Sequence, residues 1–166
     1  MPDERDAELP ADLRAAVDNA YAAFAARRIA AVGRAGEDYC AHCIDPEDDA
    51  ALRSTPVREL PMDLVGRLLM NAGTWGGVAE LRHVLPRVLE GTAADILWTD
   101  PELTVRSIGR AEPAGFTDDE RAALAGWVAA WWPRFSGDPD ALPEEVDEVR
   151  TELRAFGLID TADPLG

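Results

Sequence analysis

Two cysteines and a histidine in one short segment are the first residues whose types could do chemistry. Cys40 and Cys43 are separated by two residues, His42 lies between them, and His83 is the only other histidine. Two thiolates at this spacing can bind zinc, although a structural zinc site has four ligands. The sequence therefore allows a zinc site made of Cys40, Cys43, His83 and a carboxylate from residues 37–49, with His42 as a further candidate ligand.

Two other interpretations of the cysteine pair remain open. A thioredoxin-like redox pair opens a helix that follows a strand, and the surrounding sequence shows no strand–helix–strand pattern. The other alternative is that Cys40 and Cys43 are reduced thiols, at least one of which packs as a small apolar side chain.

A second candidate is a polar face on the helix expected around His83. In a helix Glu80, His83 and Arg87 fall on one side, away from the apolar stripe. A carboxylate, an imidazole and a guanidinium at this spacing could form an acid–base or anion-binding group, with Arg58 and Arg82 near it. The alternative is a solvated face with ion pairs worth roughly a few tenths of a kcal/mol each. The chain shows no nucleophile–base pair, phosphate loop or His-Glu-x-x-His motif, which argues against an enzyme.

A turn containing a tryptophan separates two apolar segments in the middle of the chain. Its sequence, TWGG, occupies residues 74–77. A tryptophan exposed beside arginines is a typical contributor to protein interfaces. The candidate ligand- or partner-binding residues are therefore Trp75, Arg58, Arg82 and Arg87. The alternative for Trp75 is burial against a neighbouring helix.

Helices must position these residues, because apolar residues recur at helical spacing along most of the chain. Asp-Pro pairs at 45–46 and 100–101 are typical helix starts, and Thr117 with Glu120 forms a capping box. Pro86 predicts a kink or a restart. Arg28 is the one charged residue in the apolar stripe of the first helix, and residues 103–105 are also typical of a strand. The expected helices span residues 12–32, 46–53, 62–72, 77–91, 101–109, 117–135 and 143–156.

Length and composition fit one all-α domain. The chain has 166 residues, of which 47% are apolar, so it can bury about two-thirds of its unfolded surface without a disulfide or a structural metal. We expect a disordered lead over residues 1–11, a single compact multi-helix domain of about five long and two short helices over residues 12–159, and a frayed tail over residues 160–166.

The charge of the chain limits its partners. The formal net charge is −16, and all sixteen basic residues are arginine. Nucleic acid and anionic membranes should be repelled, so neither is an expected partner, whereas a basic protein is. No apolar run approaches the ~20 residues of a membrane span. No cationic and then apolar leader begins the chain, so we expect a cytoplasmic protein.

The arginines gather next to the most acidic segment. Residues 37–50 hold six acids and no base, and residues 51–91 form the only segment with a positive net charge. We therefore expect arginines to tie the cysteine loop and the helices around the Trp75 turn together. These arginines are Arg53, Arg58, Arg82 and Arg87.

Four short motifs follow one another through this region. They are Cys40-x-x-Cys43, TPxRxL at 55–60, TWG at 74–76 and RHxLPR at 82–87. Their order resembles a family of small uncharacterised bacterial proteins, closely over residues 40–90 and loosely over the later helices. The resemblance implies no activity, cofactor or catalytic residue. The chain departs from the family at Pro61 and Gly77, where a capping hydroxyl residue and an acidic residue are expected, and this weakens any polar site at the turn.

The hypothesis that the sequence favours is an acidic cytoplasmic protein that acts by binding another protein. Small acidic immunity and antitoxin proteins are an analogy of class only. One alternative is a metal-dependent or small-molecule enzyme centred on Glu80, His83 and Arg87. Another is a zinc- or thiol-based site at Cys40 and Cys43. No resident cofactor is expected, and zinc is the one candidate.

Overall fold

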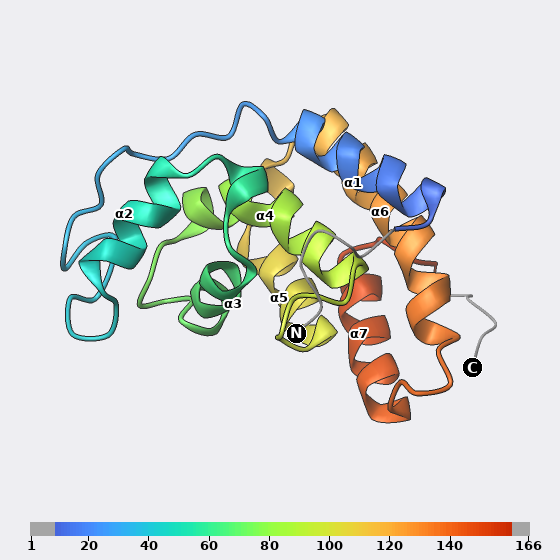
Figure 1. Ribbon diagram of the computed structural model, residues 1–166. Helices are drawn as coiled ribbons and strands as arrows, with labels where there is room; N and C mark the ends of the chain where they lie inside the picture. The colour runs from blue at the N-terminus through green and yellow to red at the C-terminus, as the bar shows by residue number, and fades with distance from the viewer. Residues whose placement is uncertain (1–8, 161–166) are drawn as a thin grey trace.

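Residues 9–160, the part of the chain that the computed structural model describes, form seven α-helices, two 3-10 helices and no β-strand (Figure 1). The all-α class predicted from helical spacing is thereby confirmed. The elements in chain order are α1 (Ala11–Ala23), α2 (Pro46–Ser54), η1 (Val57–Glu59), α3 (Met62–Met70), α4 (Val78–Ala93), α5 (Pro101–Arg110), η2 (Pro113–Gly115), α6 (Asp118–Ser136) and α7 (Pro143–Ala155).

Helix α4 is the central element. It packs against α1, α3 and α5, while α1 lies along α6 and α5 packs on α7 (Figure 1). The apolar stripe predicted for this helix is buried, from Leu81 to Val88. Because neighbours cover α4 on several sides, Pro86 and Arg87 are buried as well. The side of α4 that carries Glu80 and Arg87 is therefore not the solvated face that one of the sequence interpretations expected.

A row of aromatic side chains on α6 forms the second part of the core. Trp127, Trp131 and Phe135 stack, with ring centroids 4.8 and 4.9 Å apart, because residues four apart lie on one helix face. Trp132, which the spacing places off this stripe, is buried too. Arg150 of α7 reaches that side of α6, and its guanidinium lies 5.7 Å from the Trp132 ring centroid.

The predicted helix starts are largely confirmed. The Asp45 carboxylate accepts a hydrogen bond from the Glu47 N–H at 2.9 Å, next to the proline that opens α2. The Thr117 hydroxyl accepts from the Glu120 N–H at 3.2 Å, and the Glu120 carboxylate accepts from the Thr117 N–H at 2.7 Å. Residues 103–105 belong to α5 and not to a strand. Helix α4 runs through Pro86 without the restart that the sequence suggests.

Helix α1 is shorter than the expected span of residues 12–32, since it ends at Ala23. The next segment gives its backbone carbonyls to distant side chains. The Arg27 carbonyl lies 2.7 Å from Nδ1 of His83, and the Ala30 carbonyl accepts from Nη1 of Arg53 at 3.0 Å. These tertiary hydrogen bonds take the place of the hydrogen bonds that a longer α1 would form. Residues 24–33 are therefore a turn followed by an irregular, non-helical segment.

The chain ends fall mainly outside the described residues. The predicted disordered lead lies outside them over residues 1–8, and the predicted tail over residues 161–166. Leu9 packs against the core. Asp12 lies in the first turn of α1 and pairs with Arg134 at 3.0 Å. No helix within residues 9–160 is long and apolar enough to cross a membrane.

Alanine at Gly91 should destabilise the protein, and alanine at Gly126 should stabilise it. A Cβ on Gly91 would lie 2.7 Å from Sδ of buried Met62 and 3.1 Å from Cβ of buried Leu97. Overpacking of this kind costs about 1–3 kcal/mol. A Cβ on exposed Gly126 of α6 meets no atom within 4 Å, and alanine gains about 1 kcal/mol of helix propensity there. Urea denaturation of both variants measures the difference. An equal gain in both would show that α3 and α4 do not pack this closely.

Candidate functional site

A buried group of charged side chains organises the region around the Trp75 turn. The Arg53 side chain is 0% exposed, and its Nε donates to Oδ2 of Asp49 at 2.8 Å. Its Nη2 donates to Oε1 of Glu80 at 3.3 Å. The indole Nε1 of Trp75 donates to the other Asp49 oxygen at 3.0 Å. Buried charges are stable only when they are paired and hydrogen-bonded, so α2, the Trp75 turn and the start of α4 must keep these relative positions.

The loop before α2 is held against this group. The Cys40 N–H donates to the Thr74 carbonyl at 2.7 Å, and the Gly76 N–H donates to the Asp38 carbonyl at 2.7 Å. Gly33 passes so close to the cluster that a Cβ there would lie 1.9 Å from Oδ2 of Asp49. Only glycine allows this approach. Among the four arginines predicted to tie this region together, Arg53 is the one at the centre of the cluster. The loop itself is joined to the Trp75 turn by the two backbone hydrogen bonds.

The structure does not bring Glu80, His83 and Arg87 together. Glu80 accepts a hydrogen bond from Arg53 in the buried cluster. Arg87 is buried and donates to a backbone carbonyl at 2.9 Å and to Oε2 of Glu90 at 2.8 Å. His83 makes its hydrogen bond to another segment. The acid–base group predicted from helical spacing is therefore not formed as a unit.

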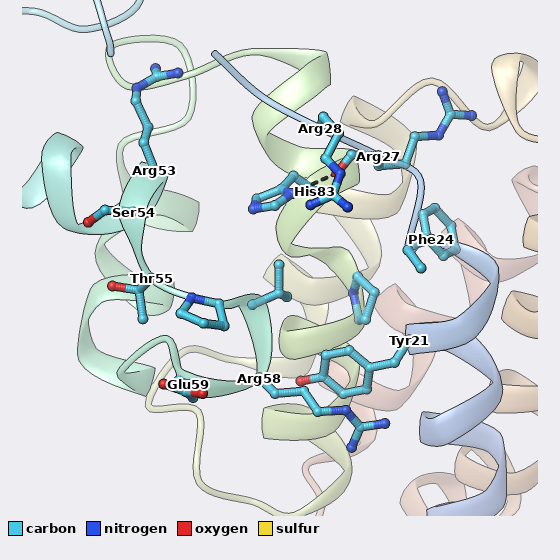
Figure 2. Close-up of a pocket in the computed structure, with 14 residues that line it drawn as sticks. Tyr21, Phe24, Arg27, Arg28, Arg53, Ser54, Thr55, Arg58, Glu59 and His83 are labelled. Atoms are coloured by element: carbon cyan, nitrogen blue, oxygen red, sulfur yellow. Dashed lines mark hydrogen bonds between the residues drawn. The ribbon is translucent and has the colours of Figure 1, made fainter. Parts of the chain in front are cut away.

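His83 instead lines a pocket of about 590 Å³ between the segment after α1, the α2–η1 connection and α4 (Figure 2). Aromatic and apolar side chains form part of its wall. The charged side chains and the one histidine that line it come from all three segments. They are Arg27, Arg28, Arg53, Arg58, Glu59 and His83.

Two of the pocket arginines are neutralised by buried or half-buried carboxylates. The guanidinium groups of the other two are exposed and can pair with a ligand. Arg53 belongs to the buried cluster. Arg27 holds Glu120 through hydrogen bonds of 2.5 and 2.7 Å, and this contact keeps the pKa of the Glu120 carboxyl below its usual value. Arg58 pairs with Asp18 at 2.7 Å, but both side chains are more than half exposed. Arg28 is exposed and forms no ion pair with any residue of the described chain.

The hydrogen bond of His83 defines its tautomer. Nδ1 lies 2.7 Å from the Arg27 carbonyl oxygen (dashed line in Figure 2). A carbonyl oxygen can only accept, so Nδ1 carries the proton and donates. Nε2 is then the ring nitrogen that remains to contact a ligand in the pocket.

The other predicted binding residues lie elsewhere. Trp75 is 2% exposed, so its ring has no surface to offer a partner. Arg82 donates to the carbonyls of Ala111 and Glu112 at 2.8 and 3.0 Å and thereby ties α4 to the end of α5. Of the four residues predicted to bind a ligand or partner, Arg58 alone lines the same pocket as His83.

The predicted zinc ligands do not converge. Cys40 and His42 line a different hollow from His83. Within the described residues, no group of three or more histidine, cysteine or acidic side chains is placed to hold a metal ion. Both cysteines are free thiols; Cys43 is exposed and Cys40 is half-buried.

Sequence reasoning missed Arg27 and Arg28 as pocket residues. They fall inside what the apolar spacing predicts as the second half of the first helix. The signal that could have found them is the charge of Arg28, which interrupts that apolar stripe. Once α1 ends at Ala23, both arginines are released from the helix and can reach the pocket.

Comparison with models of protein families, with characterised proteins and with solved structures gives no match. The similarity in motif order over residues 40–90 assigns no activity either. Function is therefore inferred from the geometry of the pocket and from the charges around it.

Replacement of Arg53 by methionine should cost about 3–5 kcal/mol of unfolding free energy. The variant leaves Asp49 and Glu80 buried without their guanidinium. The matched control is Arg134→Met, which removes an ion pair with Asp12 whose side chains are 44% and 57% exposed. An exposed pair of this kind contributes about 1 kcal/mol or less. Guanidinium denaturation compares the two. Equal losses would show that the Arg53 cluster does not organise the fold.

Proposed function

We propose that the protein binds a small organic anion in the pocket between the segment after α1, the α2–η1 connection and α4. The observation that carries this proposal is the charge of the pocket wall. In a chain of net charge −16, four arginines and a histidine line one pocket, and Glu59 is the only acidic residue among them. Clustered cations in a concave site raise the local concentration of anions.

Arg28 and Arg58 are the guanidinium groups that can contact the ligand. Arg28 has no carboxylate partner within residues 9–160, and the Asp18 partner of Arg58 is more than half exposed. An exposed ion pair contributes little, so a ligand carboxylate or phosphate can take the place of Asp18. The planar guanidinium binds either group through two parallel hydrogen bonds. Arg27 and Arg53 keep their own carboxylates and are not expected to contact the ligand.

The apolar part of the pocket favours a ligand with an apolar body. Phe24 and Pro86 are buried, and the Tyr21 ring lies beneath the Arg58 guanidinium at 3.9 Å. The Tyr21 hydroxyl donates to Oε2 of Glu90 at 2.5 Å. Burial and this hydrogen bond raise the pKa of Tyr21, so its ring is neutral at physiological pH. A benzoate-like or phenyl phosphate-like molecule has both an anionic group for the arginines and an apolar ring for the apolar part of the pocket.

His83 adds one further polar group to the pocket. Its Nδ1 donates to the Arg27 carbonyl, so Nε2 is the ring nitrogen that remains for a contact with the ligand.

The experiment is an isothermal calorimetric titration of the full chain with phenyl phosphate and, separately, with benzoate. We expect binding of at least one probe. Arg28→Ala and Arg58→Ala should each weaken it about tenfold, the effect of losing one charge-assisted hydrogen bond.

The control is Arg110→Ala, because Arg110 is an exposed arginine that does not line this pocket. It should leave the affinity unchanged. If Arg110→Ala weakens binding as much as Arg28→Ala does, the anion is held by the general field of the protein and the proposed site is wrong. Absence of binding by both probes also contradicts the proposal.

A second proposed function is binding of a basic protein through the α5–α7 surface. A hydrogen bond from the protonated Glu148 carboxyl to Glu102, together with the negative charge of Glu102, raises the pKa of Glu148, and Glu144 adds to the effect. A raised carboxyl pKa stabilises the fold at low pH, and this contribution is lost as the pH rises. At neutral pH these carboxylates therefore repel one another, and a cationic partner would relieve the repulsion. Cys40 and Cys43 are free thiols, the usual state in a reducing compartment, so we propose that this partner is met in the cytoplasm.

Glu148→Gln should change stability and partner binding in opposite directions. At neutral pH the variant should melt at a higher temperature than the wild type, because one repelling charge is removed. It should bind an oligoarginine probe more weakly at low salt. The control is Asp119→Asn, which removes an exposed charge from the first turn of α6. Equal weakening by the two variants, measured by fluorescence anisotropy of the labelled probe, would argue against a site on α5 and α7.

A further inference from the structure

Cys40 and Cys43 lie at the two ends of one hydrogen-bonded turn. The N–H groups of Cys43 and Ile44 both donate to the Cys40 carbonyl at 3.0 Å. A turn closed in this way brings its first and fourth Cα atoms within about 7 Å. Disulfides span about 4.4–6.8 Å between Cα atoms. The backbone therefore already holds the two cysteines at a separation that a disulfide accepts.

The surroundings of the two thiols differ. Interaction with the Cys43 thiol and with the backbone N–H groups of His42 and Cys43 lowers the pKa of Cys40 below the usual thiol value, and interaction with Cys40 raises the pKa of Cys43. The thiolate is the reactive form in disulfide exchange. Cys40 is also the cysteine that lines the neighbouring hollow, so we take it as the attacking residue and Cys43 as the residue that resolves the mixed disulfide.

The turn is accessible on one side and anchored on the other. Cys40 and His42 line a hollow of about 510 Å³ to which Thr74 and Gly76 also contribute. The Cys40 N–H is bonded to the Thr74 carbonyl at 2.7 Å, and the buried Ile44 follows Cys43 directly. Because the chain is held before and after the pair, a disulfide can form without moving the frame around it.

The charge near the pair selects its reaction partner. Residues 37–50 carry six acidic side chains and no basic one. Arg67 and Arg53 neutralise Asp48 and Asp49, but Asp45 and Glu47 are exposed and follow the turn immediately. An anionic molecule approaching the Cys40 sulfur is repelled by this field, whereas a neutral or cationic molecule is not.

We propose that Cys40 and Cys43 form a redox-active dithiol that small neutral or cationic disulfides oxidise to an intrachain disulfide. The Cys40 thiolate attacks one sulfur of the small disulfide, which forms a mixed disulfide and releases one small thiolate. Deprotonated Cys43 then attacks the Cys40 sulfur, which forms the Cys40–Cys43 bond and releases the second small thiolate. The two cysteine thiols lose two electrons and two protons, and the small disulfide takes them up to become two thiols. The site is separate from the anion pocket and does not depend on its ligand.

The test treats the reduced full chain with cystamine, which carries an amine on each half, and with oxidised glutathione, which is anionic. Free-thiol titration and intact mass follow the reaction. We expect a monomer that has lost two hydrogens and retains no small thiol. At low salt cystamine should react about tenfold faster than oxidised glutathione at equal concentration. High salt should reduce this ratio, because it screens the carboxylates.

Two variants separate the steps. Cys43→Ser should retain one small thiol on Cys40, since no second thiol is present to displace it. Asp45→Asn combined with Glu47→Gln keeps a capping side chain on α2 and should lower the ratio of the two rates. The proposal is overturned if the wild-type chain forms a disulfide between two molecules, if it keeps a stable mixed adduct, or if oxidised glutathione reacts as fast as cystamine at low salt.

Discussion

The Arg53 guanidinium is held by groups from three parts of the chain, and the rest of the site depends on it. Asp49 lies one turn earlier on α2, Glu80 opens α4, and the Ala30 carbonyl belongs to the segment after α1. A buried guanidinium without these acceptors would be very costly. The segments that supply them are therefore fixed relative to one another, and with them the Trp75 indole, which donates to the second Asp49 oxygen.

The same constraint shapes both the anion pocket and the hollow beside the cysteine turn. The segment after α1 has to leave the helix so that its carbonyls can meet His83 and Arg53, and this places Arg27 and Arg28 on the pocket wall. On the other side of α2, the cysteine loop closes over the Trp75 turn through two backbone hydrogen bonds of 2.7 Å. The contacts of Arg53 thus position both sites. The pocket is lined by arginines, whereas the segment around the cysteine turn is acidic.

The charge distribution explains how an acidic chain keeps a cationic pocket. Arginines on the inside face carboxylates of other elements, as Arg27 does with Glu120 and Arg53 with Glu80. The unpaired acids remain on outer surfaces, where water and salt screen them. Glu148 on α7 shows the limit of this arrangement, because its carboxyl faces another carboxyl and its pKa is raised. The net charge of the sequence therefore says little about the local charge of any one site.

The sequence alone determined the elements whose signals are local. The Asp45 cap and the capping box of Thr117 and Glu120 each depend on residues within a few positions, and each formed as predicted. Only the tertiary structure decided the end of α1 and the separation of Glu80, His83 and Arg87. It also decided the burial of Trp75. Helical spacing placed the three polar residues on one face, but each found its partner in a different distant segment, and hydrogen bonds between distant segments leave no periodic pattern in the sequence.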